Sequence, residues 1–457
     1  MAPSTPSGRG PADVRIGEAG APEPSPASPG SPFRLLVAAD FTARSSRGAL
    51  ETGDALAARA TVPVDLDTLD EALSRWQPEV EVPFDGEKKA RLRFRELDDF
   101  HPDRVFDRVP GFAGLREASE ALAARPARPR VGAEILGRIL EGASEEEVPP
   151  EPVDTAAGAM TDRMRTLLRH PAVRGLEAAW RGVDFLVRRL ELDGDLSIHL
   201  LDLSREEVEA DLGGSSDLAA TALHRILVEK TVGTPGGEPW GALVLLHDFG
   251  SAPRDLAVLW RLAQVSSRAK TPVLAGASAR LIGCESLAET PDPRDWAREP
   301  GLADAWDSLR SVPEARWIGL ALPRILLRLP YGGQTEPLET FEFEELSDPP
   351  AHDEYLWGSA ALAPALLLGE AFLADGWDLR PGQAQEIGGL PLPFEEHDGQ
   401  KAAKPCAETT MTLKGAEEIG SLGLMPLLTI KGTDVVRLGI FQSIAHPHAQ
   451  LAGRWKG

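Results

Sequence analysis

The sequence WGALVLLH, residues 240–247, contains an uninterrupted apolar run that is typical of a strand buried on both faces of a sheet. A helix with one apolar side is expected next, because apolar residues recur at helical spacing from Leu256 to Ala263. Further buried strands are expected at residues 272–277 and 317–322. This alternation predicts an α/β fold in which mixed sheets are flanked by helices.

The same alternation extends toward the N-terminus. Helical periodicity covers residues 164–190, and residues 196–203 are typical of a strand. Ser204 and Glu207 then form a capping-box pattern, which predicts the start of another helix. Residues 33–40, FRLLVAAD, predict a buried strand that runs into a polar turn.

Between these regions, residues 66–76 predict a helix with one buried stripe and residues 91–97 predict a strand with a basic face. Pro102 suits the first turn of a further helix. Proline-containing breaks follow at residues 125–130 and 144–154. The expected organisation is a disordered arm rich in Pro, Ser and Gly (1–32), a first domain (33–125), a linker with a short amphipathic helix (126–160) and a second domain (161–457).

The charge of the chain is strongly negative, and this limits the partners that it can bind. The 457 residues include 48 Lys and Arg against 71 Asp and Glu, so the net charge is 48 − 71 = −23. Nucleic acid is not expected as a partner, because phosphate binding needs a basic surface. Residues 336–354 carry eight carboxylates and no Lys or Arg, which indicates either a solvated edge or a patch that complements a basic partner surface.

Cellular location is predicted from the cysteines and the apolar stretches. Cys284 and Cys406 fit neither a disulfide framework nor a metal-binding cluster, which favours a reducing compartment. The first 31 residues lack the pattern of a secretory signal. The longest apolar stretch, residues 355–374, is interrupted by Pro, Gly and Glu, so a buried helix is expected there. We therefore expect a cytoplasmic protein without membrane insertion.

Several short strings resemble catalytic motifs. Asp248-Phe249-Gly250 copies a kinase triplet but lacks the other kinase motifs. Ser278 follows a predicted strand, as a nucleophile would, but Arg280 replaces the second glycine of the elbow. His101 lies among aspartates that more simply stabilise a helix start. The sequence predicts no assembled catalytic site, no cofactor site and no metal site.

Ordered strings in the two predicted domains resemble known proteins. Residues 33–125 resemble the small sheath subunit of type VI secretion, through FRLLV (33–37), VDLD (64–67) and above all LDDFHPD (97–103). Residues 161–457 resemble the large sheath subunit over nearly their whole length. The matching strings are HP (170–171), LEAAWRG (176–182), VGTPGGEPW (232–240), LAGAS (274–278), GLALPR (319–324), LPYG (329–332), YLWG (355–358) and GLMPL (423–427).

This resemblance implies a structural subunit of a contractile sheath, with no enzymatic activity and no cofactor. Such subunits form a helical polymer around an inner tube on a baseplate, and contraction drives effector injection. The implied partners are further copies of the chain, the inner tube protein, baseplate proteins and a ring-shaped AAA unfoldase. Two alternatives are a non-polymerising accessory or baseplate-proximal subunit, and an α/β hydrolase-like enzyme that uses Ser278. The family usually has the two subunits on separate chains, whereas one chain carries both here.

The resemblance also implies two kinds of interaction site. Strands that interlock neighbouring subunits are expected at Phe33, Leu35 and Val37 and at Leu427, Ile430, Val435, Leu438 and Phe441. The alternative is that these strands pair inside their own domains. A helix that an unfoldase recognises is expected at Ile135, Leu136, Ile139 and Leu140, although Gly137 weakens it by about 1 kcal/mol.

Overall fold

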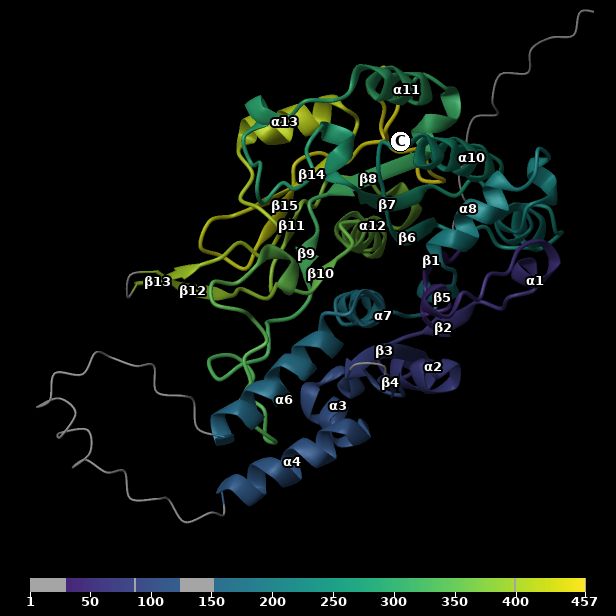
Figure 1. Cartoon of the computed structure of the whole chain (residues 1–457). Coiled ribbons are helices and arrows are strands. Elements are labelled where there is room, and N and C mark those ends of the chain that lie inside the picture. Colours follow the sequence, from purple (N-terminus) through teal and green to yellow (C-terminus); the bar gives the residue numbers. More distant parts are fainter. Residues whose placement is uncertain (1–29, 86–87, 124–151, 398–399, 457) are drawn as a thin grey trace, which may run out of the picture.

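The computed structural model describes residues 30–85, 88–123, 152–397 and 400–456, and Figure 1 shows the path of the chain. A nine-stranded sheet forms its centre. In spatial order the strands are β11 (Glu386–Ile387), β15 (Val436–Leu438), β14 (Met425–Thr429), β8 (Ile318–Leu322), β7 (Val273–Ala277), β6 (Ala242–Phe249), β1 (Phe33–Ala39), β5 (Leu196–Asp202) and β2 (Val62–Val64).

Strand β1 lies inside this sheet, between β5 and β6, and runs parallel to both. Phe33 is paired with Leu196, and Leu35 is paired with both Ile198 and Ala242. Every pairing from β5 across to β14 is parallel, whereas β2, β15 and β11 join the two ends in antiparallel fashion. The parallel strands therefore share one carboxyl edge.

Each face of the sheet carries its own hydrophobic core, because successive side chains of β1 point to opposite faces. Phe33, Leu35 and Val37 belong to one core, and Leu36 and Ala38 belong to the other. Helices α7 (Pro171–Val187) and α12 (Leu362–Asp375) cover the first face (Figure 1). The second face is covered by α8 (Arg205–Gly213), α9 (Ala222–His224), the π-helix η4 (Arg225–Val232), α10 (Pro253–Ala269), α11 (Pro300–Arg310) and α13 (Leu413–Ser421).

Residues 30–123, called here the N-terminal part, contain α1 (Gly53–Ala57), α2 (Leu69–Trp76), β3 (Glu79–Asp85), β4 (Lys88–Arg93), α3 (Pro102–Arg108) and α4 (Pro110–Ala123). They supply β1 and β2 to the sheet, and α2, β3, β4 and α3 add a layer against its first face, while α1 packs on the second (Figure 1). Val80 faces Leu92 and Val82 faces Ala90 across the antiparallel β3–β4 pair, and all four are buried. Helix α6 (Pro152–Leu168) opens the C-terminal part, residues 152–456, and packs against α4 and β3.

Smaller elements complete the chain. Two further antiparallel pairs are β9 (Ile325–Leu326) with β10 (Trp357–Gly358) and β12 (Phe394–His397) with β13 (Gln400–Ala403). The 3-10 helices are η1 (Ser45–Arg47), η2 (Leu97–Phe100), η3 (Leu218–Ala220), η5 (Ala279–Ile282), η6 (Pro293–Asp295), η7 (Pro313–Trp317), η8 (His352–Glu354) and η9 (Gly376–Asp378).

The expected α/β fold is confirmed, and the differences lie at element ends. The single helix expected at residues 164–190 is divided into α6 and α7, because Pro171 begins a new helix that the His170 side chain caps. The strand expected at 91–97 ends at Arg93. Among the described residues, no helix is long and apolar enough to cross a membrane. Residues 1–29 of the expected arm and the expected helix at 131–140 lie outside the described residues.

Candidate functional site

The candidate functional site is the seam, defined here as the contacts between the N-terminal part and the C-terminal part. Strand β1 forms its centre, since β1 belongs to the N-terminal part and both of its neighbours belong to the C-terminal part. Aromatic contacts hold it at either end. The ring of Phe33 lies 4.8 Å from that of Phe372, and Trp180 Nε1 donates a 3.0 Å hydrogen bond to the carbonyl of Phe41.

An ion-pair network continues the seam beyond the carboxyl ends of β1 and β5. Glu207 is fully buried and receives the Arg59 guanidinium through both carboxylate oxygens. Arg59 also binds Glu51 at 2.9 Å, and Arg44 binds the same Glu51 at 2.8 Å. Burial alone would raise the pKa of Glu207, but the hydrogen bonds from Arg59 hold it below its ordinary value. Both Glu207 and Arg59 are therefore charged at neutral pH.

Asp202, at the end of β5, is a second buried carboxylate in this network. It accepts hydrogen bonds from the backbone N–H of Thr42 at 3.1 Å and from the Thr42 hydroxyl at 2.8 Å. Burial raises its pKa to about 6, and the nearby Asp40 adds to the rise, while Thr42 and the arginines oppose it. Asp202 consequently takes up a proton at a higher pH than an ordinary aspartate does.

The string LDDFHPD, residues 97–103, forms a third set of seam contacts. Pro102 begins α3, and the His101 ring caps it by accepting the Asp103 N–H. The Asp103 carboxylate then accepts the N–H of Glu339 at 3.0 Å and both the N–H (3.1 Å) and the hydroxyl (2.6 Å) of Thr340. The string LDDFHPD, which above all carried the small-subunit resemblance, therefore also binds the C-terminal part.

The acidic stretch 336–354 contacts a basic surface of its own chain. Glu345 and Glu354 are buried, and they pair with Arg328 at 2.6 Å and with Arg169 at 2.8 Å. Arg328 also binds Glu177 of α7 at 2.7 Å. Several other carboxylates of the stretch are exposed: Glu336, Glu339, Glu342, Glu344, Asp348 and Asp353. The stretch is thus partly buried, where Glu345 and Glu354 bind arginines of its own chain, and partly exposed to solvent.

The predicted interlocking residues lie in three places. Phe33, Leu35 and Val37 are in β1, which is paired on both sides within the chain. Leu438 is in β15, which pairs with the edge strand β11, and Leu427 is in β14, the next strand inward. Val435 precedes β15, Phe441 is buried, and Ile430 is exposed at the β14–β15 turn. Their exchange between subunits stays a prediction, and the predicted unfoldase helix lies outside the described residues.

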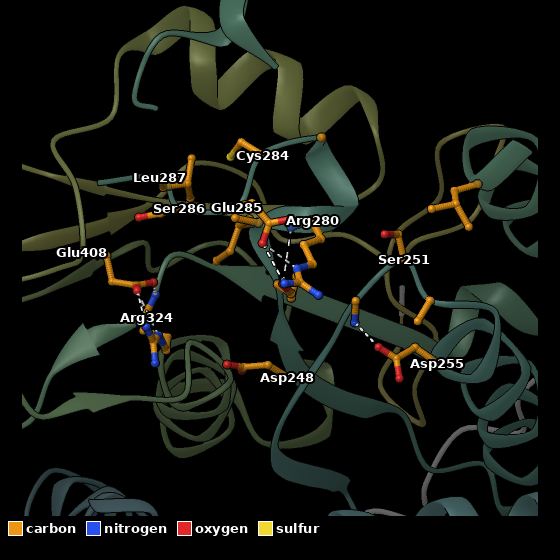
Figure 2. A pocket seen from close by; sticks show the side chains of 18 of the residues that line it. Asp248, Ser251, Asp255, Arg280, Cys284, Glu285, Ser286, Leu287, Arg324 and Glu408 are labelled. Carbon is orange, nitrogen blue, oxygen red and sulfur yellow. Dashed lines mark hydrogen bonds and ion pairs between the residues drawn. The ribbon is translucent and has the colours of Figure 1, made fainter. Parts of the chain in front are cut away.

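The strings that resembled catalytic motifs meet at a cavity over the carboxyl ends of β6, β7 and β8 (Figure 2). Ser278 caps η5, and its hydroxyl accepts the Arg280 N–H at 3.3 Å. Arg280 pairs with Glu285 at 2.7 Å, and Arg324 pairs with Glu408. In the part of the chain that the structure describes, no group of three His, Cys, Asp or Glu side chains could hold a metal ion.

Sequence reasoning identified some seam residues and missed others. The Ser204–Glu207 capping box is confirmed, with both reciprocal hydrogen bonds present. The capping pattern revealed only one role of Glu207, because its binding to Arg59 joins residues far apart in the chain. Asp202 and Arg59 carry no local signal, since a polar residue at a strand end or loop is common.

Comparison with known proteins agrees with this geometry. Residues 153–445 match the family described as EvpB/VC_A0108, tail sheath N-terminal domain (VipB). Residues 29–128 match the family described as type VI secretion system, VipA, VC_A0107 or Hcp2. The chain is also similar to the type VI secretion system sheath protein TssC1 of Pseudomonas aeruginosa, at 34% identity over 299 residues. That alignment covers 63% of this chain and 59% of the length of TssC1.

The two family matches correspond to the two parts that the seam joins, since one covers residues 29–128 and the other begins at residue 153, at the start of α6. The VipB match alone extends over more than half of the chain. The chain therefore belongs to the type VI secretion tail sheath family, a family of structural proteins and not of enzymes, and it joins a VipA-type region to a VipB-type region.

Proposed function

We propose that this chain is a sheath protomer that polymerises around an inner tube on a baseplate and contracts to drive effector injection. The observation that carries the proposal is the position of β1, which is the first strand of the VipA-type region and an inner strand of the VipB-type sheet. Removing an inner strand breaks hydrogen bonds on both of its edges. The two regions thus move as one body when a neighbouring subunit pulls on either of them.

Covalent linkage supports the same conclusion. Two regions on one chain meet at an effective concentration set by the linker, so the seam forms without a second chain. The Arg59–Glu207 pair and the contacts of Asp103 then fix the orientation of the two regions. A subunit of defined shape is what a helical polymer needs, since each contact is repeated along it.

We assign interlocking to one end of the sheet, the end formed by β11, β15 and β14. Strand β2 contains Pro63, which lacks a backbone N–H and so discourages pairing at that edge. At the other end, β11 and the β14–β15 pair lie next to an edge that has no further strand among the residues described. Strand addition by a neighbouring subunit at this end would extend the sheet, with Ile430 at the adjacent turn.

Electron microscopy of the purified full-length protein tests the proposal. Hollow tubes of regular diameter are the expected result, from the chain alone or with its inner tube protein. Dispersed particles in both preparations would instead support a non-polymerising accessory or baseplate-proximal subunit.

A pair of surface variants tests the assigned edge. Ile430→Lys places a charge at the β14–β15 turn and should shorten or abolish the tubes. Val232→Lys is the matched control, because Val232 is exposed to the same extent, 41% against 40%, but ends helix η4. Equal tube formation by both variants would contradict the assignment of this edge.

A further inference from the structure

The carboxyl edge of the parallel strands is hollowed into a cleft. One cavity of about 330 Å³ lies between the ends of β1 and β6, and another of about 760 Å³ lies over the ends of β6, β7 and β8. Asp248 and Arg324 line both, so the two cavities adjoin at these residues. After β1 the chain builds β2 and β5 on one side and then crosses to β6 on the other. Open α/β sheets bind ligands at such a switch point.

The backbone around Asp248 is shaped to present its carboxylate in this cleft. The register between β6 and β7 shifts between Leu245 and Asp248, and irregularities of this kind re-aim a side chain. Across from Asp248, β7 has Gly276, where a Cβ atom would lie 1.8 Å from Asp248 Oδ1. Any residue other than glycine would therefore displace the carboxylate.

Asp248 has no direct partner for this carboxylate among the residues that the structure describes, and Figure 2 shows its side chain in the cleft. The nearest arginines are bound elsewhere. Arg324 is paired with Glu408. Arg205 is paired with Asp255, and its hydrogen bond to Asp248 goes to the backbone carbonyl of that residue. Solvent reaches Asp248 through the cleft, yet the protein packed around it raises the pKa of its carboxyl.

We propose that this cleft binds an organic cation, an ammonium or guanidinium group, with Asp248 as the anion that receives it. The lining supports a cation, because five carboxylates and only two arginines line the larger cavity. A metal ion would need further ligands, and both oxygens of the nearby Asp40 already accept hydrogen bonds from Arg44 and Ser45. A charge-assisted hydrogen bond to a carboxylate suits an ammonium or guanidinium group well.

The cation has two sources with the same chemistry, a Lys or Arg side chain of a second copy and a small amine in solution. Binding of a side chain from a second copy rests on the proposed polymer, whereas binding of a small amine does not. Two measurements distinguish them, and both compare Asp248→Asn with Glu299→Gln. Glu299 lines the same cavity, so the control removes one charge from the cleft and leaves Asp248 in place.

The first measurement is saturation-transfer NMR of n-butylammonium chloride with the dispersed full-length protein, against sodium chloride at equal ionic strength. Wild type and Glu299→Gln should bind the amine, and Asp248→Asn should bind it at least about tenfold more weakly. Gly276→Ala gives a second variant, which displaces the carboxylate without removing its charge. It should behave like Asp248→Asn, and this keeps the test decisive if Asp248→Asn folds poorly.

The second measurement is sedimentation of assembled polymer. A loss of pelleted protein in Asp248→Asn but not in Glu299→Gln assigns the cation to a neighbouring subunit. Unchanged pelleting together with lost amine binding assigns it to a small amine. Equal behaviour of Asp248→Asn and Glu299→Gln in both measurements overturns the inference. Failure of every variant to pellet, wild type included, would contradict only the proposed polymer, because the amine titration uses dispersed protein.

Discussion

Replacing Asp202 by asparagine should change how the stability of the seam depends on pH. Burial raises the pKa of Asp202 from 3.8 to about 6 in the folded chain. Between these two values the folded protein holds a proton that the unfolded chain has released. Stability due to this group therefore falls as pH rises through the window, and it is regained on acidification.

The magnitude follows from the shift in pKa. A difference of about two units corresponds to about 3 kcal/mol of free energy of unfolding. The asparagine side chain does not titrate, so the wild-type value minus the Asp202→Asn value isolates the effect from other carboxylates. This difference should increase by about 2–3 kcal/mol from about pH 7 to about pH 4.

Urea unfolding followed by tryptophan fluorescence measures the free energies across this range. Hydrogen exchange of the Thr42 amide gives a local readout, because that N–H donates to Asp202 Oδ1. When this amide exchanges through global unfolding, its protection relative to Asp202→Asn should grow at acid pH. A difference that is flat, or that shrinks on acidification, would refute the reasoning and mean that Arg44 and Arg59 keep Asp202 charged.

Other seam contacts give three further predictions. Arg59→Met leaves Glu207 buried without its main partner, so it should lower the free energy of unfolding, measured in urea, by about 3–5 kcal/mol. Adding Glu207→Gln to this variant should restore part of that free energy. If it restores none, the pairing is contradicted. Asp103→Ala should speed hydrogen exchange in the loop that Asp103 binds, and Asp98→Ala, at an exposed position of the same string, should not; equal effects would count against docking by Asp103. Arg328→Lys should lower the melting temperature nearly as much as Arg328→Met, because lysine lacks the planar guanidinium that binds both Glu177 and Glu345. A wild-type melting temperature in the lysine variant would argue against this binding.

Much of the fold could be predicted because its signals are local. The apolar runs at residues 33–39 and 242–245 lie in inner strands of a mainly parallel sheet, where both faces are buried. The start of α8 could be placed because Ser204 and Glu207 satisfy each other's backbone groups. Element ends were less certain, as at His170, where capping and proline compete with a continuous helical periodicity.

The seam could be predicted only in part, since its partners are distant in sequence. A buried strand at residues 33–39 was predictable, but its position between β5 and β6 depends on pairings that no local pattern encodes. The cleft shows the same limit. In the sequence Gly276 is merely one position of the string LAGAS (274–278), whereas its spatial role is to leave room for Asp248. That role depends on a shift in strand register, which leaves no trace in hydrophobic periodicity.

The inner position of β1 also decides the order in which the protein can fold. Strand β1 is synthesised before both of its partner strands, which begin only at Leu196 and Ala242. Closing so long a loop is slow, although its entropic cost grows only slowly with length. Until then, the mostly apolar segment FRLLVAA has no partner strand, and such segments promote aggregation. The seven residues of β1 can therefore pair on both sides only after the chain has been synthesised through β6, which ends at Phe249.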